Sequence, residues 1–200
     1  MANHKGNLYL HHLTPDVINR LWEIFASFVK EVDSAGKLGV LLFQFPPWFY
    51  PNQENLDYLL ACRRRFPDYQ LAVEFRTGSW FSREQIKETL NFLRQHQIAL
   101  VCVDEPQGLK TSIPMMAEVT SSFGIVRFHG RNAENWERKG IPAEERFNYY
   151  YKEDELKTWL TKVMRMAAQA EKVHDIFKNK TKDFSVKNAT EFTRMLDSST

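Results

Sequence analysis

The sequence lacks the features that mark secreted, membrane-bound and disulfide-rich proteins. Two cysteines, Cys62 and Cys102, occur among 200 residues, and neither has a C-x-x-C or other metal-ligand spacing, which favours free thiols in a reducing compartment. No run approaches the roughly 18 apolar residues of a membrane span. The first ten residues show no basic stretch followed by an apolar run, as a signal peptide would. We therefore expect a cytoplasmic protein without a membrane segment.

The sequence also has no large excess of positive or negative charge and none of the common catalytic signatures. Lys and Arg number 27 against 25 for Asp and Glu, a net charge of +2, which leaves no electrostatic footprint for nucleic acid. The sequence contains no G-x-S-x-G elbow, no G-x-G-x-x-G turn and no Walker loop. A functional interpretation must therefore rest on where the polar residues fall in the fold.

Short apolar runs alternate with amphipathic segments along the whole chain. Runs that are apolar on both faces are typical of parallel strands covered by helices. The expected strands are Leu38–Phe45, Leu71–Phe75, Ala99–Val103, Gly124–Phe128 and Val173–Phe177. The expected helices are Thr14–Val32, Asn52–Arg65, Ser82–Gln95, Lys152–Ala170 and Asp183–Leu196. The order predicts one α/β domain over residues 1–200, a (β/α) barrel-type sheet of about five parallel strands.

Each expected strand carries polar residues at or just past its C-terminal end. In parallel α/β barrels these ends meet on one face, which holds the active site. We therefore predict a shared polar site formed by Gln44, Glu74, Arg76, Asp104, Glu105, Arg127, His129, Arg131, Asn132 and Asn179.

The carboxylates of this set are the first catalytic candidates. Glu74 and Arg76 point to the same side of their strand because side chains alternate, and the arginine would keep the glutamate ionised. Of the neighbours Asp104 and Glu105 only one can face the site, and we favour Asp104, which shares a side with Cys102. The alternatives are a structural ion pair for Glu74 and a loop-capping role for the other carboxylates.

The segment Arg127-Phe-His129-Gly-Arg131-Asn132 is the richest in polar groups. Arg127 and His129 share a side, and Gly130 allows a sharp turn. His129 could act as a base, an acid or a metal ligand. No second histidine completes a metal-binding spacing, so the spacing does not support a divalent metal cofactor and does not exclude one. Two arginines beside it suit an anionic group such as phosphate or carboxylate. The alternative is an arginine network that only satisfies the strand ends.

Aromatic residues flank the same strand ends. Trp48, Phe49 and Tyr50 follow the first strand, and Trp80 with Phe81 follows the second. They could stack a sugar or a base, or they could plug the loops of the barrel rim. We assign Trp80 to substrate binding together with the arginines and asparagines.

At these residues the sequence resembles the YecE-like family, a bacterial and archaeal family of unknown function. The resemblance rests on motifs in the family's order and spacing: Leu41-Leu-Phe-Gln-Phe-Pro-Pro47, Val73-Glu-Phe-Arg76 with Ser79-Trp-Phe81, Val103-Asp-Glu-Pro106, Val126-Arg-Phe-His-Gly-Arg-Asn132, and Phe177-x-Asn179 followed by Val186-Lys-Asn-Ala189. It implies a TIM-type barrel with a polar pocket and no established reaction. Lys178 stands where the family usually has asparagine.

The resemblance also implies that the family's first strands have no counterpart here. The chain starts near a stretch that follows the family's third strand, so its strands resemble the last five of eight. Five strands cannot close a barrel, and the outer strands would be uncovered edges. We expect a marginally stable monomer that self-associates through those edges.

Three functions remain open at this point. The first is a hydrolase or isomerase remnant acting on a small polar, anionic or sugar-like ligand, with Glu74, Asp104 and His129 as catalytic residues. The second is a metal-dependent phosphodiesterase similar to endonuclease IV, which acts on nucleic acid and needs more histidine ligands than this chain offers. The third is a non-catalytic binding protein.

Overall fold

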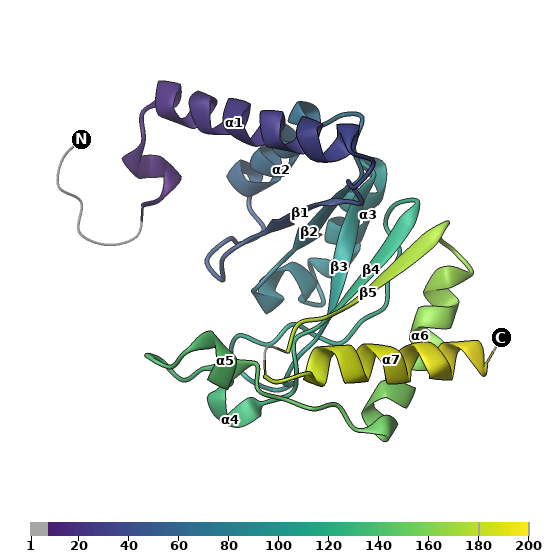
Figure 1. Cartoon of the computed structure of the whole chain (residues 1–200). Helices are drawn as coiled ribbons and strands as arrows, with labels where there is room; N and C mark the ends of the chain where they lie inside the picture. The colour runs from purple at the N-terminus through teal and green to yellow at the C-terminus, as the bar shows by residue number, and fades with distance from the viewer. Residues whose placement is uncertain (1–7, 180, 200) are drawn as a thin grey trace. The chain divides into compact units, whose positions relative to one another are not determined.

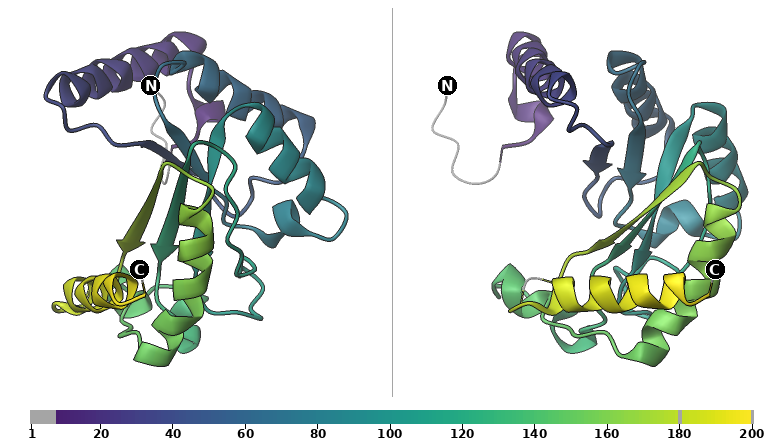
Figure 2. Two further views of the ribbon diagram at one scale, coloured as in Figure 1. Left: turned by 90° about the vertical axis from the view of Figure 1, so that its right-hand side faces the viewer. Right: turned by 45° about the vertical axis from the view of Figure 1, so that its right-hand side comes forward.

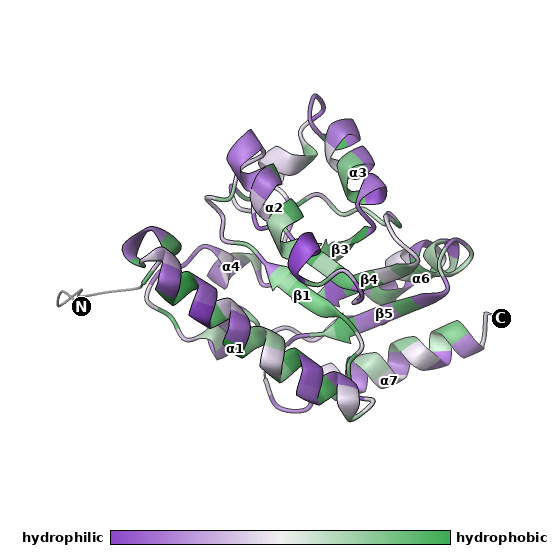
Figure 3. Ribbon diagram, turned by 90° about the horizontal axis from the view of Figure 1, so that it is seen from above, coloured by the Kyte–Doolittle hydropathy of each residue, from purple (hydrophilic) through white to green (hydrophobic). Residues whose placement is uncertain are grey.

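The structure is a computed structural model that describes residues 8–179 and 181–199. The chain divides into two compact units, Met1–Gly39 and Val40–Thr200. The first contains the short helix η1 (Leu10–His12) and the long helix α1 (Pro15–Ser34). Thr14 lies in the extended N-cap conformation and Pro15 takes the first helical position, as the sequence predicts. Figure 3 shows polar and apolar residues interleaved along α1, the pattern of an amphipathic helix.

The second unit is built on one parallel sheet of five strands, and it confirms the predicted alternation of strands and helices (Figure 1). The strands pair in sequence order, β1-β2-β3-β4-β5. They are β1 (Leu41–Gln44), β2 (Leu71–Glu74), β3 (Ile98–Asp104), β4 (Phe123–Phe128) and β5 (Lys172–Phe177). Their C-terminal ends therefore lie along one edge of the sheet, where the sequence placed the polar residues.

Helices follow the strands as expected, with three short additions. Those of the second unit are α2 (Gln53–Arg65), η2 (Gly78–Phe81), α3 (Ile86–Gln95), α4 (Ala133–Trp136), α5 (Ala143–Arg146), α6 (Glu153–Ala167) and α7 (Phe184–Asp197). The sequence pattern missed η2, α4 and α5 because four residues are too few to show a helical period. Within the described part of the chain, no helix is long and apolar enough to cross a bilayer.

The register of the strands sorts their side chains onto two faces. Gln44 pairs with Glu74, and Arg127 pairs with both Val103 and Ile176. Residues paired across parallel strands point the same way, so these side chains share one face, which we call the site face. Every second residue, Phe128 among them, points to the opposite side, which we call the helix face.

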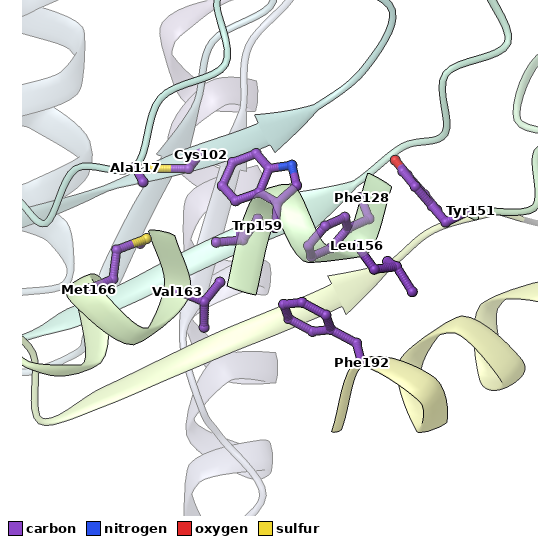
Figure 4. Packing of buried hydrophobic residues seen from close by; sticks show 10 residues of the cluster. Cys102, Ala117, Phe128, Tyr151, Leu156, Trp159, Val163, Met166 and Phe192 are labelled. Carbon is purple, nitrogen blue, oxygen red and sulfur yellow. The ribbon is translucent and has the colours of Figure 1, made fainter. Parts of the chain in front are cut away.

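The helix face carries a large part of the buried core. Cys102, Val126 and Phe128 pack there against residues of α6 and α7, of which Leu156, Trp159 and Phe192 are fully buried or nearly so (Figure 4). The two views of Figure 2 show α6 running alongside β4 and β5. A Cβ atom on Gly124 would lie 2.9 Å from Met166 Cε, the flexible end of an α6 side chain, which would have to shift. This packed layer fixes β4, whose end bears Arg127 and His129.

Candidate functional site

Glu74, at the end of β2, is the centre of a buried polar cluster on the site face. Its side chain has no exposed surface. Oε1 accepts hydrogen bonds from Arg76 Nη1 at 3.1 Å and His129 Nε2 at 3.0 Å, and Oε2 accepts from Arg127 Nη1. Burial would raise the pKa of Glu74, but the His129 hydrogen bond and the nearby positive charges outweigh it and lower the pKa to about 2. Glu74 is therefore an ionised carboxylate in the interior.

His129 is the partner of Glu74 and is also fully buried. Burial lowers its pKa to about 4, although the hydrogen bond to Glu74 opposes the shift. The neutral ring that donates from Nε2 must leave Nδ1 unprotonated. Nδ1 is buried and has no hydrogen-bond partner among the described residues. The ring thus presents an unused lone pair, held in direction by Glu74.

Arg127 joins β4 to the first two strands of the sheet. Besides Glu74, its Nη1 contacts Gln44 Oε1 at 3.2 Å, so residues from the ends of β1, β2 and β4 meet in one cluster. Its Nε atom is buried without a hydrogen-bond acceptor in the described part of the chain. As the sequence predicts, the side chains of five residues therefore lie together: Gln44, Glu74, Arg76, Arg127 and His129.

The second carboxylate of this cluster is Glu105, not Asp104. Glu105 is fully buried, its Oε2 lies 3.4 Å from Arg76 Nη1, and its Oε1 accepts from Ile113 N at 2.7 Å. Burial is the main cause that raises its pKa, to about 7. The choice of Asp104 over Glu105 was wrong because alternation relates residues of one strand and does not tell which side faces the site.

Asp104 lies on the helix face and is fully engaged by hydrogen-bond donors. Arg131 donates to it from Nε at 2.9 Å and Nη2 at 2.7 Å, Tyr151 from its hydroxyl at 2.7 Å, and Trp159 from Nε1 at 2.5 Å. Arg131 also lies 3.5 Å from Glu155. Asp104 and Arg131 therefore tie the end of β3 to α6 and the segment before it, away from Glu74.

Gly130 makes the sharp turn after β4 that the sequence predicts. Its φ is +90°, and a Cβ atom there would lie 2.7 Å from Tyr149 Cβ, so only glycine fits. Its N–H donates to the Tyr151 hydroxyl at 2.8 Å. The turn separates His129, which faces Glu74, from Arg131, which faces Asp104.

Trp80 does not present a surface for a ligand. Its side chain is fully buried, its Nε1 donates to Phe49 O at 2.6 Å, and its ring stacks on Phe75 at 4.2 Å between centroids. The buried ring agrees with the alternative that Trp80 plugs a loop, so the substrate-binding prediction has no geometric support for this residue. Trp48 and Tyr50 remain 56% and 53% exposed.

The two predicted asparagines hold loops together. Asn132 caps α4 by accepting from Asn135 N at 3.3 Å and donates to Glu145 O at 3.0 Å. Asn179 donates to Tyr149 O at 2.7 Å, and Asn188 accepts from Tyr151 N and donates to Tyr151 O. Their amides therefore fix the segment between α5 and α6, so the substrate-binding prediction has no geometric support for either.

Aromatic rings that the sequence did not single out flank His129. The rings of Trp136 and Phe147 lie 6.3 and 6.1 Å from it, and the Arg76 guanidinium lies 5.3 Å above the Trp136 ring. The Lys178 ammonium lies 5.2 Å above the Phe147 ring. Both rings belong to the long connection after β4, where no periodic signal marked them.

No three His, Cys, Asp or Glu side chains gather to bind a metal ion within residues 8–179 and 181–199. The cluster around Glu74 instead combines one histidine, two carboxylates and two arginines. Such a set suits proton transfer and the binding of an anion.

Comparison with known proteins places this chain in a family of unknown function. Residues 6–200 match the model described as protein of unknown function DUF72, and the chain belongs to this family. It is 35% identical over 168 residues to the UPF0759 protein YunF of Bacillus subtilis (strain 168). The family's lack of a known function agrees with the resemblance seen in the sequence, although the matches do not carry the YecE name.

Solved structures of the same family are similar to this chain. A DUF72 protein from Thermotoga maritima MSB8 is 38% identical with a TM-score of 0.78, and one from Enterococcus faecalis V583 is 31% identical with a TM-score of 0.81. Each comparison covers 88% of this chain, and 64% and 66% of those chains respectively. The match to YunF covers 82% of this chain and 59% of YunF. The chain therefore spans less than two thirds of the length of these relatives.

Proposed function

We propose that the Glu74–His129 pair is the acid–base centre of an enzyme, a hydrolase or an isomerase that acts on a polar, anionic or sugar-like substrate. The observation that carries this proposal is the buried His129 ring, which donates to Glu74 and keeps an unpartnered Nδ1. An oriented imidazole with a free lone pair is the arrangement of a general base whose partner fixes its tautomer.

The proton would move along a short path. His129 Nδ1 takes a proton from a substrate hydroxyl or a water molecule, and the Glu74 carboxylate stabilises the imidazolium that forms. Arg76 and Arg127 hold the negative charge of the substrate. Because their positive charges contribute to the low pKa of His129, a bound anion would raise that pKa toward neutrality.

Glu105 is proposed as the second acid–base group in place of Asp104. Its pKa of about 7 leaves part of the population protonated at neutral pH, whereas Glu74 stays ionised. Two carboxyl groups whose surroundings separate their pKa values are a recurring basis for assigning acid and base roles. Glu105 would supply a proton to the leaving or rearranging oxygen.

The test is a search for turnover with sugar phosphates, free sugars, sugar acids and phosphodiesters as substrates. Any activity should fall about 100-fold or more in Glu74→Gln and His129→Gln, the range of a lost acid–base group. Arg83→Gln, at an exposed position outside the cluster, is the matched control. Activity that persists in His129→Gln contradicts the proposal, and binding without any turnover would favour a non-catalytic role.

We also propose that the five strands correspond to the last five of a TIM-type barrel. All are parallel and in sequence order, so β1 and β5 are the outer strands of the described sheet, each paired with a strand on one side. Uncovered edges invite pairing with another chain, so the 200-residue chain should self-associate. Light scattering coupled to gel filtration tests the self-association, and a monomer that melts cooperatively and reversibly contradicts it.

A further inference from the structure

His129 cannot contact a substrate in the arrangement that the structure shows. Its side chain has no exposed surface, and neither has that of Glu74. A general base must come within hydrogen-bond distance of the proton that it takes. Some element that covers the ring must therefore move before the pair can act, and the residues around the ring identify that element.

The ring of His129 is flanked by the long connection between β4 and α6. Trp136 and Phe147 of this connection lie 6.3 and 6.1 Å from it between ring centroids, and the two rings meet edge to face at 5.9 Å. On its other side the ring contacts Glu74 of β2, a strand that pairs with both β1 and β3. Displacing β2 would break two ladders of hydrogen bonds, so the connection is the part that can move.

Both ends of this connection are fixed to one carboxylate. Arg131 at its start donates to Asp104 from Nε at 2.9 Å, and Tyr151 at its end donates to Asp104 from its hydroxyl at 2.7 Å. A Cβ atom on Gly130 would lie 2.7 Å from Tyr149 Cβ, so the backbone enters and leaves the connection at neighbouring points. Loops whose ends lie this close form compact units. The connection can therefore turn about its two ends while β4 and α6 stay in place.

Between these ends, residues 132–149 are held together by hydrogen bonds of their own. Asn132 Nδ2 donates to Glu145 O at 3.0 Å, and Arg146 Nη1 donates to Trp136 O at 2.7 Å. Most of the turn between α4 and α5 is exposed, and Figure 1 shows these two helices grouped at one end of the sheet. The segment is thus a small body with a solvent-facing outer side and His129 beneath its inner side.

Contacts at α4 hold the segment in its closed position. Glu137, exposed at the end of α4, accepts from Thr111 N at 2.9 Å and from Thr111 Oγ1 at 3.1 Å. Thr111 belongs to the connection between β3 and β4, outside the segment. The Arg76 guanidinium lies 5.3 Å above the Trp136 ring. Because water competes for exposed hydrogen bonds, their net contribution is small and such contacts can break and form again.

We propose that residues 132–149 form a lid over His129, which opens about its ends at Asp104 and is held closed by the contact between Glu137 and Thr111. The proposal rests on the proposed function and concerns how a substrate reaches the Glu74–His129 pair. In the open state Trp136 leaves the ring, and a substrate or water can contact it. In the closed state the lid keeps water away from the pair, as lids over reacting groups do.

Chemical modification of His129 measures the opening without any need for a substrate. Diethyl pyrocarbonate reacts with neutral imidazole nitrogen atoms that it can contact, and peptide mass spectrometry separates His129 from the exposed His11 and His12, which serve as internal standards. His129 should react more slowly than these two. Its rate should depend only weakly on urea below the unfolding transition, because opening a lid exposes much less surface than unfolding does.

Two variants of α4 test the contact that closes the lid. Glu137→Ala removes the carboxylate to which Thr111 donates, and it should speed the modification of His129 about three- to tenfold. Glu134→Ala makes the same change of charge at an exposed position on the same helix and should leave the rate unaltered. Urea unfolding of both variants compares their stability. If Glu137→Ala also lowers it, the urea dependence of the modification rate still separates opening from unfolding.

The outcomes separate the lid from the proposed enzyme. Faster modification in Glu137→Ala alone, with a weak urea dependence, supports the lid. The proposal is overturned by an unmodified His129 in the folded chain, by the full urea dependence of unfolding, or by equal rates in both variants and the unchanged chain. Opening in a chain without turnover refutes only the enzymatic function. Turnover that requires His129, with modification unaffected by Glu137→Ala, refutes only the lid.

Discussion

Glu74 and Asp104 are both fully buried carboxylates at the ends of neighbouring strands, yet their surroundings differ. Asp104 accepts hydrogen bonds from Arg131, Tyr151 and Trp159, and these bonds fix the segment of each donor to the end of β3. Glu74 accepts from Arg76, Arg127 and His129, and two atoms of those partners remain unsatisfied within the described chain. A closed network is typical of structural support, whereas an open one is typical of a binding site.

The largest expected difference between the two clusters is in stability. Asp104→Asn puts an amide N–H₂ among donors on the packed helix face and leaves the Arg131 charge without its partner, so unfolding should become easier by about 3–5 kcal/mol. Glu74→Gln also removes the carboxylate partner of Arg127, but it should cost less, about 2–3 kcal/mol. The His129 ring can change tautomer, Glu105 remains beside Arg76, and Gln44 Oε1 still accepts from Arg127. Urea unfolding measures both. A larger loss for Glu74→Gln would reverse the assignment of structural and functional carboxylates.

Most of the fold could be predicted from the sequence, because it depends on periodicity that is local. The apolar runs located all five strands, and Thr14-Pro15 and Asn52 marked helix starts to within a residue. The choice between Asp104 and Glu105 could not be made, because it depends on which face the helices cover. That choice is fixed by Trp159, which lies 55 residues from Asp104 in sequence.

The site residues divide in the same way. Glu74 with Arg76 and Arg127 with His129 were paired correctly, since the members of each pair lie two residues apart at the end of one strand. Trp80 in η2 and Asn132 at the start of α4 also follow strand ends, but their side chains form hydrogen bonds with the backbone of neighbouring segments. Position along a strand therefore predicted where polar groups gather and did not predict which of them remain available to a ligand.

The second prediction concerns pH and separates Glu105 from the closed cluster. The folded-state pKa of Glu105 is raised from 4.5 to about 7, so its contribution to stability is complete below pH 4.5 and is lost as the pH rises through 7. Glutamine does not ionise, so Glu105→Gln removes this loss of stability at high pH, and its amide oxygen can still accept from Ile113 N. The stability of the variant relative to the unchanged chain should therefore increase between pH 5 and 8 by up to about 3 kcal/mol.

The measurement is the free energy of unfolding of both proteins across that pH range. Two other groups affect stability in this range. The pKa of His129 falls from 6.5 to about 4 on folding, so it titrates there in the unfolded chain, and burial raises the pKa of Asp175 to about 6. Their effects cancel in the difference because both proteins contain them. Parallel curves for the two proteins would show that Glu105 is ionised throughout and would remove it as an acid.

The smallest predicted effect is the coupling between the two clusters. Trp159→Phe removes the donor to Asp104 Oδ2 and should cost about 1–3 kcal/mol, and Glu74→Gln acts on the opposite face of the sheet. Two hydrogen bonds from backbone N–H groups link the clusters: His129 N donates to Asp104 O at 2.8 Å, and Gly130 N donates to the Tyr151 hydroxyl. The double variant should therefore show additive losses to within about 0.5 kcal/mol. A coupling of 1 kcal/mol or more is on the scale seen for residues within one network. It would mean that the Asp104 cluster and the Glu74 cluster act as a single unit, so that ligand binding at His129 would change the stability of α6.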